Sequence, residues 1–203
     1  MGDPKFARRR YEKPAHPWED ARIKEERELQ IKYGLKNKRE LWKMKSKLRE
    51  IRRQARQLQG RLRKKEPQAE KETSWLVKKL INQGLLTEEK STLDDILALN
   101  VEDILNRRFQ TIAYMKGLAT TIAQVRQFIV HGHISINGRK VTVPGYLVKK
   151  DEEQNIEYHS GSTLTNPNHP LRVESKPKEP KESKEPKEQK ESKNAKSEVK
   201  SDG

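Results

Sequence analysis

The 203-residue sequence contains no cysteine. This absence excludes disulfide bonds, thiol nucleophiles and thiolate metal ligands. Hydrophobic residues make up 31% of the chain and aromatic residues only 5%, so there is material for one modest core and not for a large enzyme domain. No run approaches the ~20 apolar residues of a membrane span, and the first residues lack the apolar segment of a signal peptide. We therefore expect a soluble, intracellular chain, and no feature predicts a cofactor.

Acidic residues are too few to balance the basic ones. Lysine and arginine number 45 against 30 aspartates and glutamates, a formal net charge of +15. The first 65 residues hold 23 basic and 9 acidic side chains, whereas residues 66–105 hold 4 and 9. Because neutralising phosphates releases counterions and drives binding, a cationic block of this size predicts a polyanionic partner. A merely solubilising surface would intersperse both signs.

Composition and patterning divide the chain into four segments. Residues 1–16 form a basic arm, broken by prolines, that we expect to be extended and ordered only against a partner. Residues 17–105 form a helical domain, and residues 106–172 a compact module. Residues 173–203 form a Lys/Glu/Pro/Ser tail that cannot bury enough apolar surface to fold, so we expect it to be disordered. The expected fold class is α+β, with a mainly helical N-terminal domain followed by two helices on a short antiparallel sheet.

A long helix between residues 41 and 62 is the most informative element of the N-terminal domain. Its apolar residues recur at alternating spacings of three and four, which places them on one stripe. The opposite face carries no acid, and such a face suits contact with phosphates. A coiled coil and a membrane-surface helix are the alternatives. The residues of this basic face are Trp42, Lys45, Arg49, Arg52, Arg53, Arg56, Arg63 and Lys64.

Shorter helices are expected after the long one. Trp75 lies at helical spacing from Leu76 and Leu80, which favours a place in the core, so Trp42 is the better candidate for stacking on a base. A first helix from Pro17 to about Gly34 precedes the long one, and one continuous helix is expected from residue 100 to 117. The candidate N-caps are Thr73 or Ser74, Thr92 and Asn100.

The period of the sequence changes in the module. A capping box opened by Thr121 precedes a helix that stops at Gly132. Residues 133–136 alternate as a strand, and Asn137-Gly138 is the strongest short hairpin signal. A third strand is expected over residues 155–158.

Short motifs along the chain are more specific than its composition. The motifs are Arg9-Arg10-Tyr11-Glu12-Lys13-Pro14, Tyr33-Gly34-Leu35-Lys36-Asn37-Lys38, Arg108-Phe109, Gly117-Leu118-Ala119, Arg126-Gln127, His131-Gly132-His133-Ile134 and Asn137-Gly138. Those from residue 108 onward resemble the RNA-binding module named for the fourth protein of the small ribosomal subunit. The resemblance extends over about residues 3–165, and the N-terminal motifs resemble the archaeal and eukaryotic branch of that ribosomal family. Gln110 stands where the module often has Asp and Ile122 where it often has Arg, and the cysteine zinc site of many bacterial members has no counterpart.

The resemblance implies a structural constituent of the small (30S) ribosomal subunit and not an enzyme. It implies a primary binder of small-subunit (16S) ribosomal RNA that nucleates assembly of the subunit body and contributes to translational accuracy. It also implies a cytoplasmic location and contact with the fifth and twelfth small-subunit proteins, with no membrane or DNA partner. The alternative is a free RNA-binding stress protein, or one associated with RNA modification, that uses the same module. The sequence shows no phosphate-binding glycine loop or nucleophile elbow that would favour an enzyme.

The expected mode of binding is recognition of folded RNA by shape and phosphate geometry. Two structural alternatives stay open: Arg107 or Arg108 could pair with an acid one turn earlier, Glu102 or Asp103, and the histidines beside Gly132 could bind a metal, although no third ligand is identifiable. A helix cap or an RNA hydrogen bond is the favoured role for those histidines. The candidate RNA-binding residues are Arg8, Arg9, Arg10, Lys45, Arg49, Arg52, Arg53, Arg56, Arg107, Arg108, Thr121, Arg126, Gln127, His131, His133, Asn137, Arg139 and Lys140.

Overall fold

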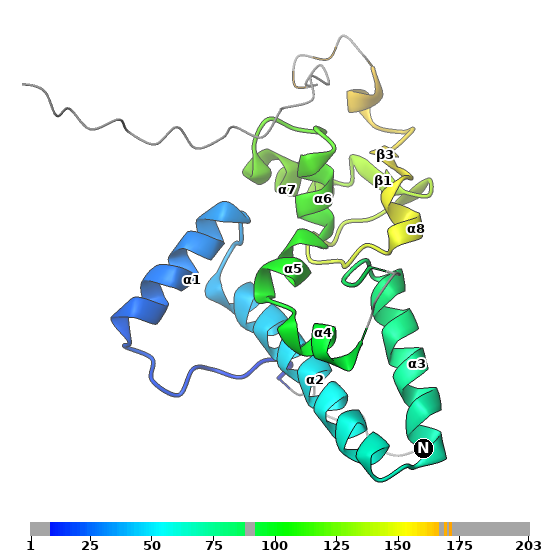
Figure 1. Ribbon diagram of the computed structural model, residues 1–203. Helices are drawn as coiled ribbons and strands as arrows, with labels where there is room; N and C mark the ends of the chain where they lie inside the picture. The colour runs from blue at the N-terminus through cyan, green and yellow to red at the C-terminus, as the bar shows by residue number, and fades with distance from the viewer. Residues whose placement is uncertain (1–8, 88–91, 167–168, 170, 172–203) are drawn as a thin grey trace, which may run out of the picture.

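The computed structural model describes residues 9–87, 92–166, 169 and 171, and the predicted tail and Arg8 lie outside these residues. A long central helix, α2, has α1 on one side and α3 on the other, and the module with the small sheet lies beyond one end of α2 (Figure 1). The predicted α+β class is confirmed. The elements are α1 (Asp20–Lys32), α2 (Lys38–Arg63), α3 (Pro67–Asn82), α4 (Leu93–Ala98), α5 (Val101–Asn106), α6 (Phe109–Met115), α7 (Ile122–His131), β1 (Ile134–Ile136), β2 (Arg139–Lys140), α8 (Lys150–Glu153), β3 (Ile156–Tyr158) and a 3-10 turn (Thr163–Thr165).

The predicted long helix is α2, and its apolar stripe faces the chain's own helices. Leu48, Ile51 and Ala55 are buried and share one core with Leu80 of α3 and Ile96 of α4. The stripe is therefore covered within the chain, which favours neither a coiled coil nor a membrane-surface helix. None of the described helices combines the length and the apolar character needed to cross a bilayer.

Helix α3 differs from the prediction in two ways. It begins at Pro67, with Glu66 as N-cap, because a proline fits the first helical turn. Thr73 is consequently inside the helix, where its hydroxyl donates to the Ala69 carbonyl at 2.7 Å. Trp75 is 64% exposed, so its predicted place in the core is wrong. It is next to buried Leu76 but 100° away around the helix, and it therefore points away from α2.

The continuous helix expected from residue 100 to 117 is two helices. Asn100 caps the first as predicted, with its backbone N–H donating to Asp103 at 2.7 Å. The chain then becomes extended at Arg108, which bridges to Leu147 of the module. The next residue, Phe109, donates its N–H to the Tyr146 carbonyl at 2.8 Å. This pairing with a distant loop separates α5 from α6 and overrides the local helical pattern.

The strands and the hairpin turn that the sequence predicts for the module are present. Its sheet has the order β2-β1-β3 with both pairs antiparallel, and the third strand is at Ile156–Tyr158 as expected. Asn137 and Gly138 both have positive φ, at 51° and 74°, as a two-residue hairpin turn requires. Gly132 ends α7 in the left-handed conformation. Helices α6 and α7 cover a core that includes Phe109 and Ile134.

Candidate nucleic-acid interface

The basic arm lies against α2. The N–H of Glu12 donates to Ser46 Oγ at 3.2 Å, and the Glu12 carboxylate pairs with Arg49. The Tyr11 ring lies 6.0 Å from the Trp42 ring between centroids, and the Arg9 guanidinium is 5.6 Å from the Tyr11 ring. The sequence predicts an arm that is ordered only against a partner; in the structure Tyr11 and Glu12 contact α2 of the chain itself, and the His16 carbonyl accepts from Arg22 of α1 at 2.9 Å. The arm brings Arg9 and Arg10 beside α2.

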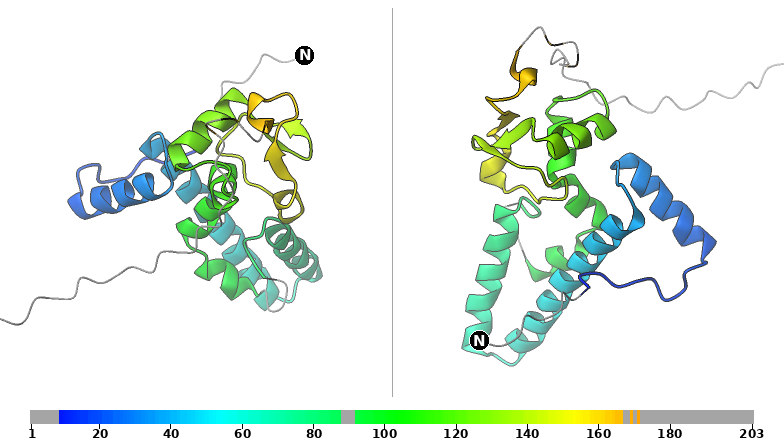
Figure 2. Two further views of the ribbon diagram at one scale, coloured as in Figure 1. Left: turned by 90° about the horizontal axis from the view of Figure 1, so that it is seen from above. Right: turned by 180° about the vertical axis from the view of Figure 1, so that it is seen from behind.

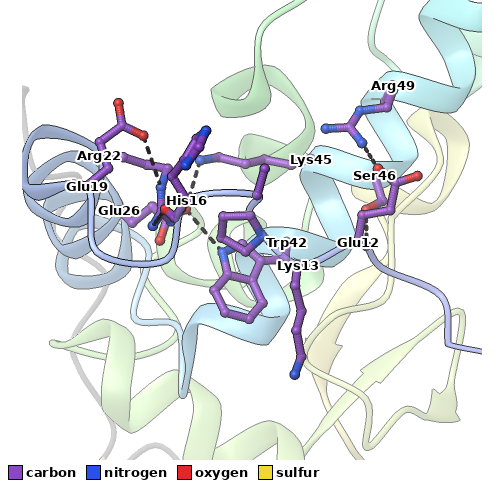
Figure 3. A pocket seen from close by; sticks show the side chains of 12 residues that line it. Glu12, Lys13, His16, Glu19, Arg22, Glu26, Trp42, Lys45, Ser46 and Arg49 are labelled. Atoms are coloured by element: carbon purple, nitrogen blue, oxygen red, sulfur yellow. Dashed lines mark hydrogen bonds and ion pairs between the residues drawn. The ribbon is translucent and has the colours of Figure 1, made fainter.

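A cleft of about 290 Å³ separates the arm from α1 and α2, and beside it lies Glu26, which is 1% exposed (Figure 3). Its carboxylate accepts hydrogen bonds from Lys45, the Trp42 indole and Arg22, each at 3.1 Å. Burial alone would raise the pKa of Glu26, but hydrogen bonds from Lys45 and Trp42 outweigh it and the pKa is lowered. Lys45 and Trp42 therefore hold α1 on α2, and Trp42 is not available as an open stacking platform.

A second acid, the partly buried Glu40 of α2, joins the helical domain to the module. Its carboxylate accepts from Arg108 at 2.9 Å and from Arg126 at 2.5 and 3.1 Å. Burial opposes ionisation of Glu40, yet the bonds from Arg126 and Arg108 lower its pKa. Beside this triad, Gln110 donates its amide to the Gly34 carbonyl at 3.1 Å. We refer to Glu40, Arg108 and Arg126 as the Glu40 clasp.

The clasp corrects two expectations about arginines. Arg108 is predicted to contact RNA, but its side chain is 1% exposed and lies inside the fold. Its partner Glu40 is 68 residues away in sequence, and the pairing with Glu102 or Asp103 is wrong as well. Arg126 is only partly exposed and is committed to the same carboxylate.

Two further arginines that are predicted to contact RNA, Arg107 and Arg52, form hydrogen bonds within the fold. Arg107 donates to Glu153 of α8 at 2.7 Å and to the Val148 carbonyl at 3.2 Å, again in place of the expected partner one turn earlier. Arg52 donates to the Leu99 carbonyl at 2.5 Å and ties α2 to the end of α4. These arginines position elements of the fold, and neither is fully exposed.

Exposed arginines remain along the arm and α2. Arg53 pairs with Glu50 through two bonds of 2.7 and 2.9 Å, but both side chains are about half exposed, and exposed pairs of this kind exchange partners readily. Arg56 is exposed and forms no ion pair with a described residue. We define the arm–helix patch as Arg9, Arg10, Arg49, Arg53 and Arg56.

A second exposed group surrounds the end of α7 and the hairpin. Gly132 allows the Lys140 side chain to pass close to the backbone, since a Cβ at this position would lie 1.7 Å from Lys140 Cε. We define the hairpin patch as Gln127, His131, Asn137, Arg139 and Lys140, all of which are exposed.

Thr121 and His133 of the candidate set are tied to the fold near this patch. The Thr121 hydroxyl accepts from the Gln124 N–H at 3.2 Å and caps α7. The Gln124 side chain accepts from the Thr120 N–H at 3.1 Å instead of the Thr121 N–H, so only one of the two bonds of the predicted capping box is present. His133 Nδ1 is 2.8 Å from Ser162 Oγ, and burial, followed by the charges of His131 and Lys140, lowers the pKa of His133. No group of three His, Asp or Glu side chains among the described residues could hold a metal ion.

The sequence analysis did not identify the two acids, Glu26 and Glu40, that hold some of the basic side chains inside the fold. Glu40 is at the third position of α2 behind the N-cap Asn37, whose side chain accepts from the Glu40 N–H at 3.3 Å. That spacing is a local helix-start signal, and it gives no indication of a partner in the module. Glu26 is one acid among several in α1, which has no amphipathic pattern to mark its buried position.

Two protein-family models match the chain. Residues 3–106 match the model described as the ribosomal protein S4/S9 N-terminal domain, and residues 107–153 match the S4 domain. Three similar proteins, each named small ribosomal subunit protein uS4, come from Picrophilus torridus, Thermoplasma volcanium and Methanococcus aeolicus. The first is 53% identical over 174 residues, which are 86% of this chain and 94% of the relative. The Thermoplasma volcanium protein is 50% identical over 85% of this chain and 86% of its own length. The Methanococcus aeolicus protein is 50% identical over 86% of this chain and 97% of its own length.

Proposed function

The chain belongs to the uS4 family of small ribosomal subunit proteins, and from this premise we propose that it is a structural constituent of the small subunit that binds small-subunit ribosomal RNA. The family implies a structural role rather than a catalytic one and a location in the ribosome. The observation that carries RNA binding is the exposure of the arm–helix patch and the hairpin patch, in contrast to Arg52, Arg107, Arg108 and Arg126, which are buried or partly buried.

The geometry of these patches supports recognition of RNA by shape. A-form RNA presents phosphates and a shallow minor groove, while its major groove is too narrow for side chains to read. Arg53 and Arg56 project from a rigid helix, and Arg139 and Lys140 from a hairpin braced by the module core. Such elements fix the spacing of positive charges, so they can match the phosphate spacing of one folded RNA better than that of an unrelated one.

The family resemblance supports finer proposals. We infer that the protein is a primary binder of small-subunit ribosomal RNA that nucleates assembly of the subunit body. We also infer that it contributes to the accuracy of translation. We further infer that the protein contacts the fifth and twelfth small-subunit proteins. We also infer that it is located in the cytoplasm. Arg8 of the arm belongs to the same proposal by its position next to Arg9.

The salt dependence of RNA binding tests the arm–helix patch. Removing one arginine that binds a phosphate should reduce the slope of log affinity against log salt by roughly one. We expect the double substitution Arg53→Ala, Arg56→Ala to flatten the slope by about two, or by about one if Arg53 stays with Glu50. Arg61→Ala is the matched control, since Arg61 is an exposed arginine of α2 that lies outside the arm–helix patch and pairs with Glu72 of α3. Equal slopes for the double variant and wild type would remove α2 from the interface.

Sedimentation separates the proposal from its alternative. A structural constituent travels with small subunits in a one-to-one ratio and stays with them at moderate salt. A free stress protein or a partner of a modifying enzyme would be found mainly in the unbound fractions. That second distribution would contradict the structural role while leaving RNA binding possible.

A further inference from the structure

The outer face of α3 is basic and aromatic, and nothing in the proposed interface uses it. On a helical wheel with buried Leu76 at zero, the sector from about 200° to 300° contains no acid. Glu72 lies just outside the sector, at about 320°, and pairs with Arg61. The residues of this sector, which we call the α3 face, are Gln68, Lys71, Trp75, Lys78, Lys79 and Asn82.

Trp75 is at the centre of the α3 face. Its side chain is 64% exposed, and the Lys79 ammonium is 5.0 Å from the ring centroid. Lys71, Lys78 and Lys79 are exposed and form no ion pair with a described residue. An exposed indole costs free energy in water unless a partner covers it, and lysines on both sides of it favour a partner with negative charge.

Trp18 shows that exposure of an indole alone is not the signal. It is 90% exposed, but it is followed directly by Glu19 and Asp20. A phosphate beside Trp18 would meet like charge. Trp75 is the exposed tryptophan whose helix face has lysines and lacks acids.

We propose that the α3 face is a third binding site for the ribosomal RNA, in which an unpaired base stacks on Trp75 and the flanking phosphates contact Lys71, Lys78 and Lys79. Aromatic side chains between cations form the stacking platforms of proteins that bind unpaired nucleotides. Helix α3 lies on the other side of α2 from α1 (Figures 1 and 2), so the site is separate from the arm. The inference rests on the proposed function, because it takes the bound polymer to be the same RNA.

The test compares two exposed tryptophans in the full chain. Affinity for purified small-subunit ribosomal RNA is measured for wild type, Trp75→Ala, Trp75→Phe and Trp18→Ala at one salt concentration. We expect Trp75→Ala to lower affinity roughly 5- to 100-fold, the range that removal of one stacked base gives. Trp75→Phe should retain most of the affinity, and Trp18→Ala should match wild type. Urea midpoints of all variants should agree, because both indoles are exposed.

The salt dependence of the affinity separates the contribution of stacking on Trp75 from that of the lysine charges. Trp75→Ala should lower the affinity without changing the salt slope, whereas Lys71→Ala, Lys78→Ala should flatten the slope. Selective binding by wild type with no effect of Trp75→Ala would overturn this inference and leave the proposed function standing. A Trp75→Ala variant with full RNA affinity but reduced entry into subunits would assign the face to a protein partner, and would also overturn it. Failure of wild type to bind selectively would overturn both proposals.

Discussion

At the scale of single residues, the position of each acid decides which cations are available to a ligand. Glu26 and Glu40 are embedded among basic side chains, and between them they engage Arg22, Lys45, Arg108 and Arg126. A buried arginine without its counter-charge is strongly unfavourable, so these pairs are stable features of the fold. Residue type therefore predicted a cationic protein correctly, but it could not separate the arginines that hold the fold from those that face outward.

Removal of the Glu40 charge should destabilise the protein. Glu40→Gln keeps the size of the side chain but leaves Arg108, 1% exposed, without a counter-charge. We expect the free energy of unfolding in urea to fall by about 3–5 kcal/mol, the usual effect of breaking a buried pair from one side. Glu50→Gln, which breaks the exposed pair with Arg53, should change little and serves as the control. Equal stability of the two variants would show that the clasp contributes nothing.

The clasp also makes stability depend on pH in the acid range. The pKa of Glu40 is lowered in the folded chain from its usual value of 4.5, so the folded state favours the ionised form. Its contribution is fully present above about pH 4.5 and is lost as the pH falls through the lowered pKa. Unfolding midpoints measured from pH 7 to pH 3 should decline below about pH 4.5 for wild type and decline less for Glu40→Gln. Parallel curves for the two proteins would contradict this assignment.

At the scale of elements, the turn between α1 and α2 docks the helical domain on the module. Gly34 has φ of +57°, and a Cβ there would lie 2.2 Å from Ile122 Cγ2 of α7. Gly34→Ala should therefore lower the free energy of unfolding by more than about 1 kcal/mol, from strain and from displacement of α7. Gly60, inside α2 with no neighbouring atom within 4 Å, is the control, and Gly60→Ala should stabilise by about 0.5–1 kcal/mol. Urea unfolding measures both, and a neutral Gly34→Ala would show that the turn is not a tight contact.

Elements with strong local signals were predictable, and elements shaped by distant partners were not. The stripe of α2 and the Asn137-Gly138 turn depend on nearby residues, so sequence alone identified both. The break at Arg108 depends on Leu147, and the place of the arm depends on Ser46 and Trp42, which are distant in sequence. The same reason explains why the sequence carries no sign of the internal bonds that Lys45 forms with Glu26 and that Arg52 forms with the Leu99 carbonyl.

At the scale of the whole molecule, two cationic patches on different parts of the fold are joined by the Glu40 clasp. The arm–helix patch depends on α2, and the hairpin patch depends on the module. Because Glu40 lies on α2 and Arg126 on α7, the clasp fixes how the two patches are placed relative to each other. Their relative placement, rather than their charge alone, is what can distinguish one folded RNA from another polyanion.

Selective binding is therefore the property whose measurement tests recognition by shape. The purified full chain is bound to small-subunit ribosomal RNA across a salt series, with an excess of unrelated structured RNA and of DNA as competitors. We expect binding that survives the competitors at moderate salt, since two fixed patches match one folded RNA. Binding that the competitors abolish at every salt concentration would show that the chain acts as a general polycation, and would contradict recognition by shape.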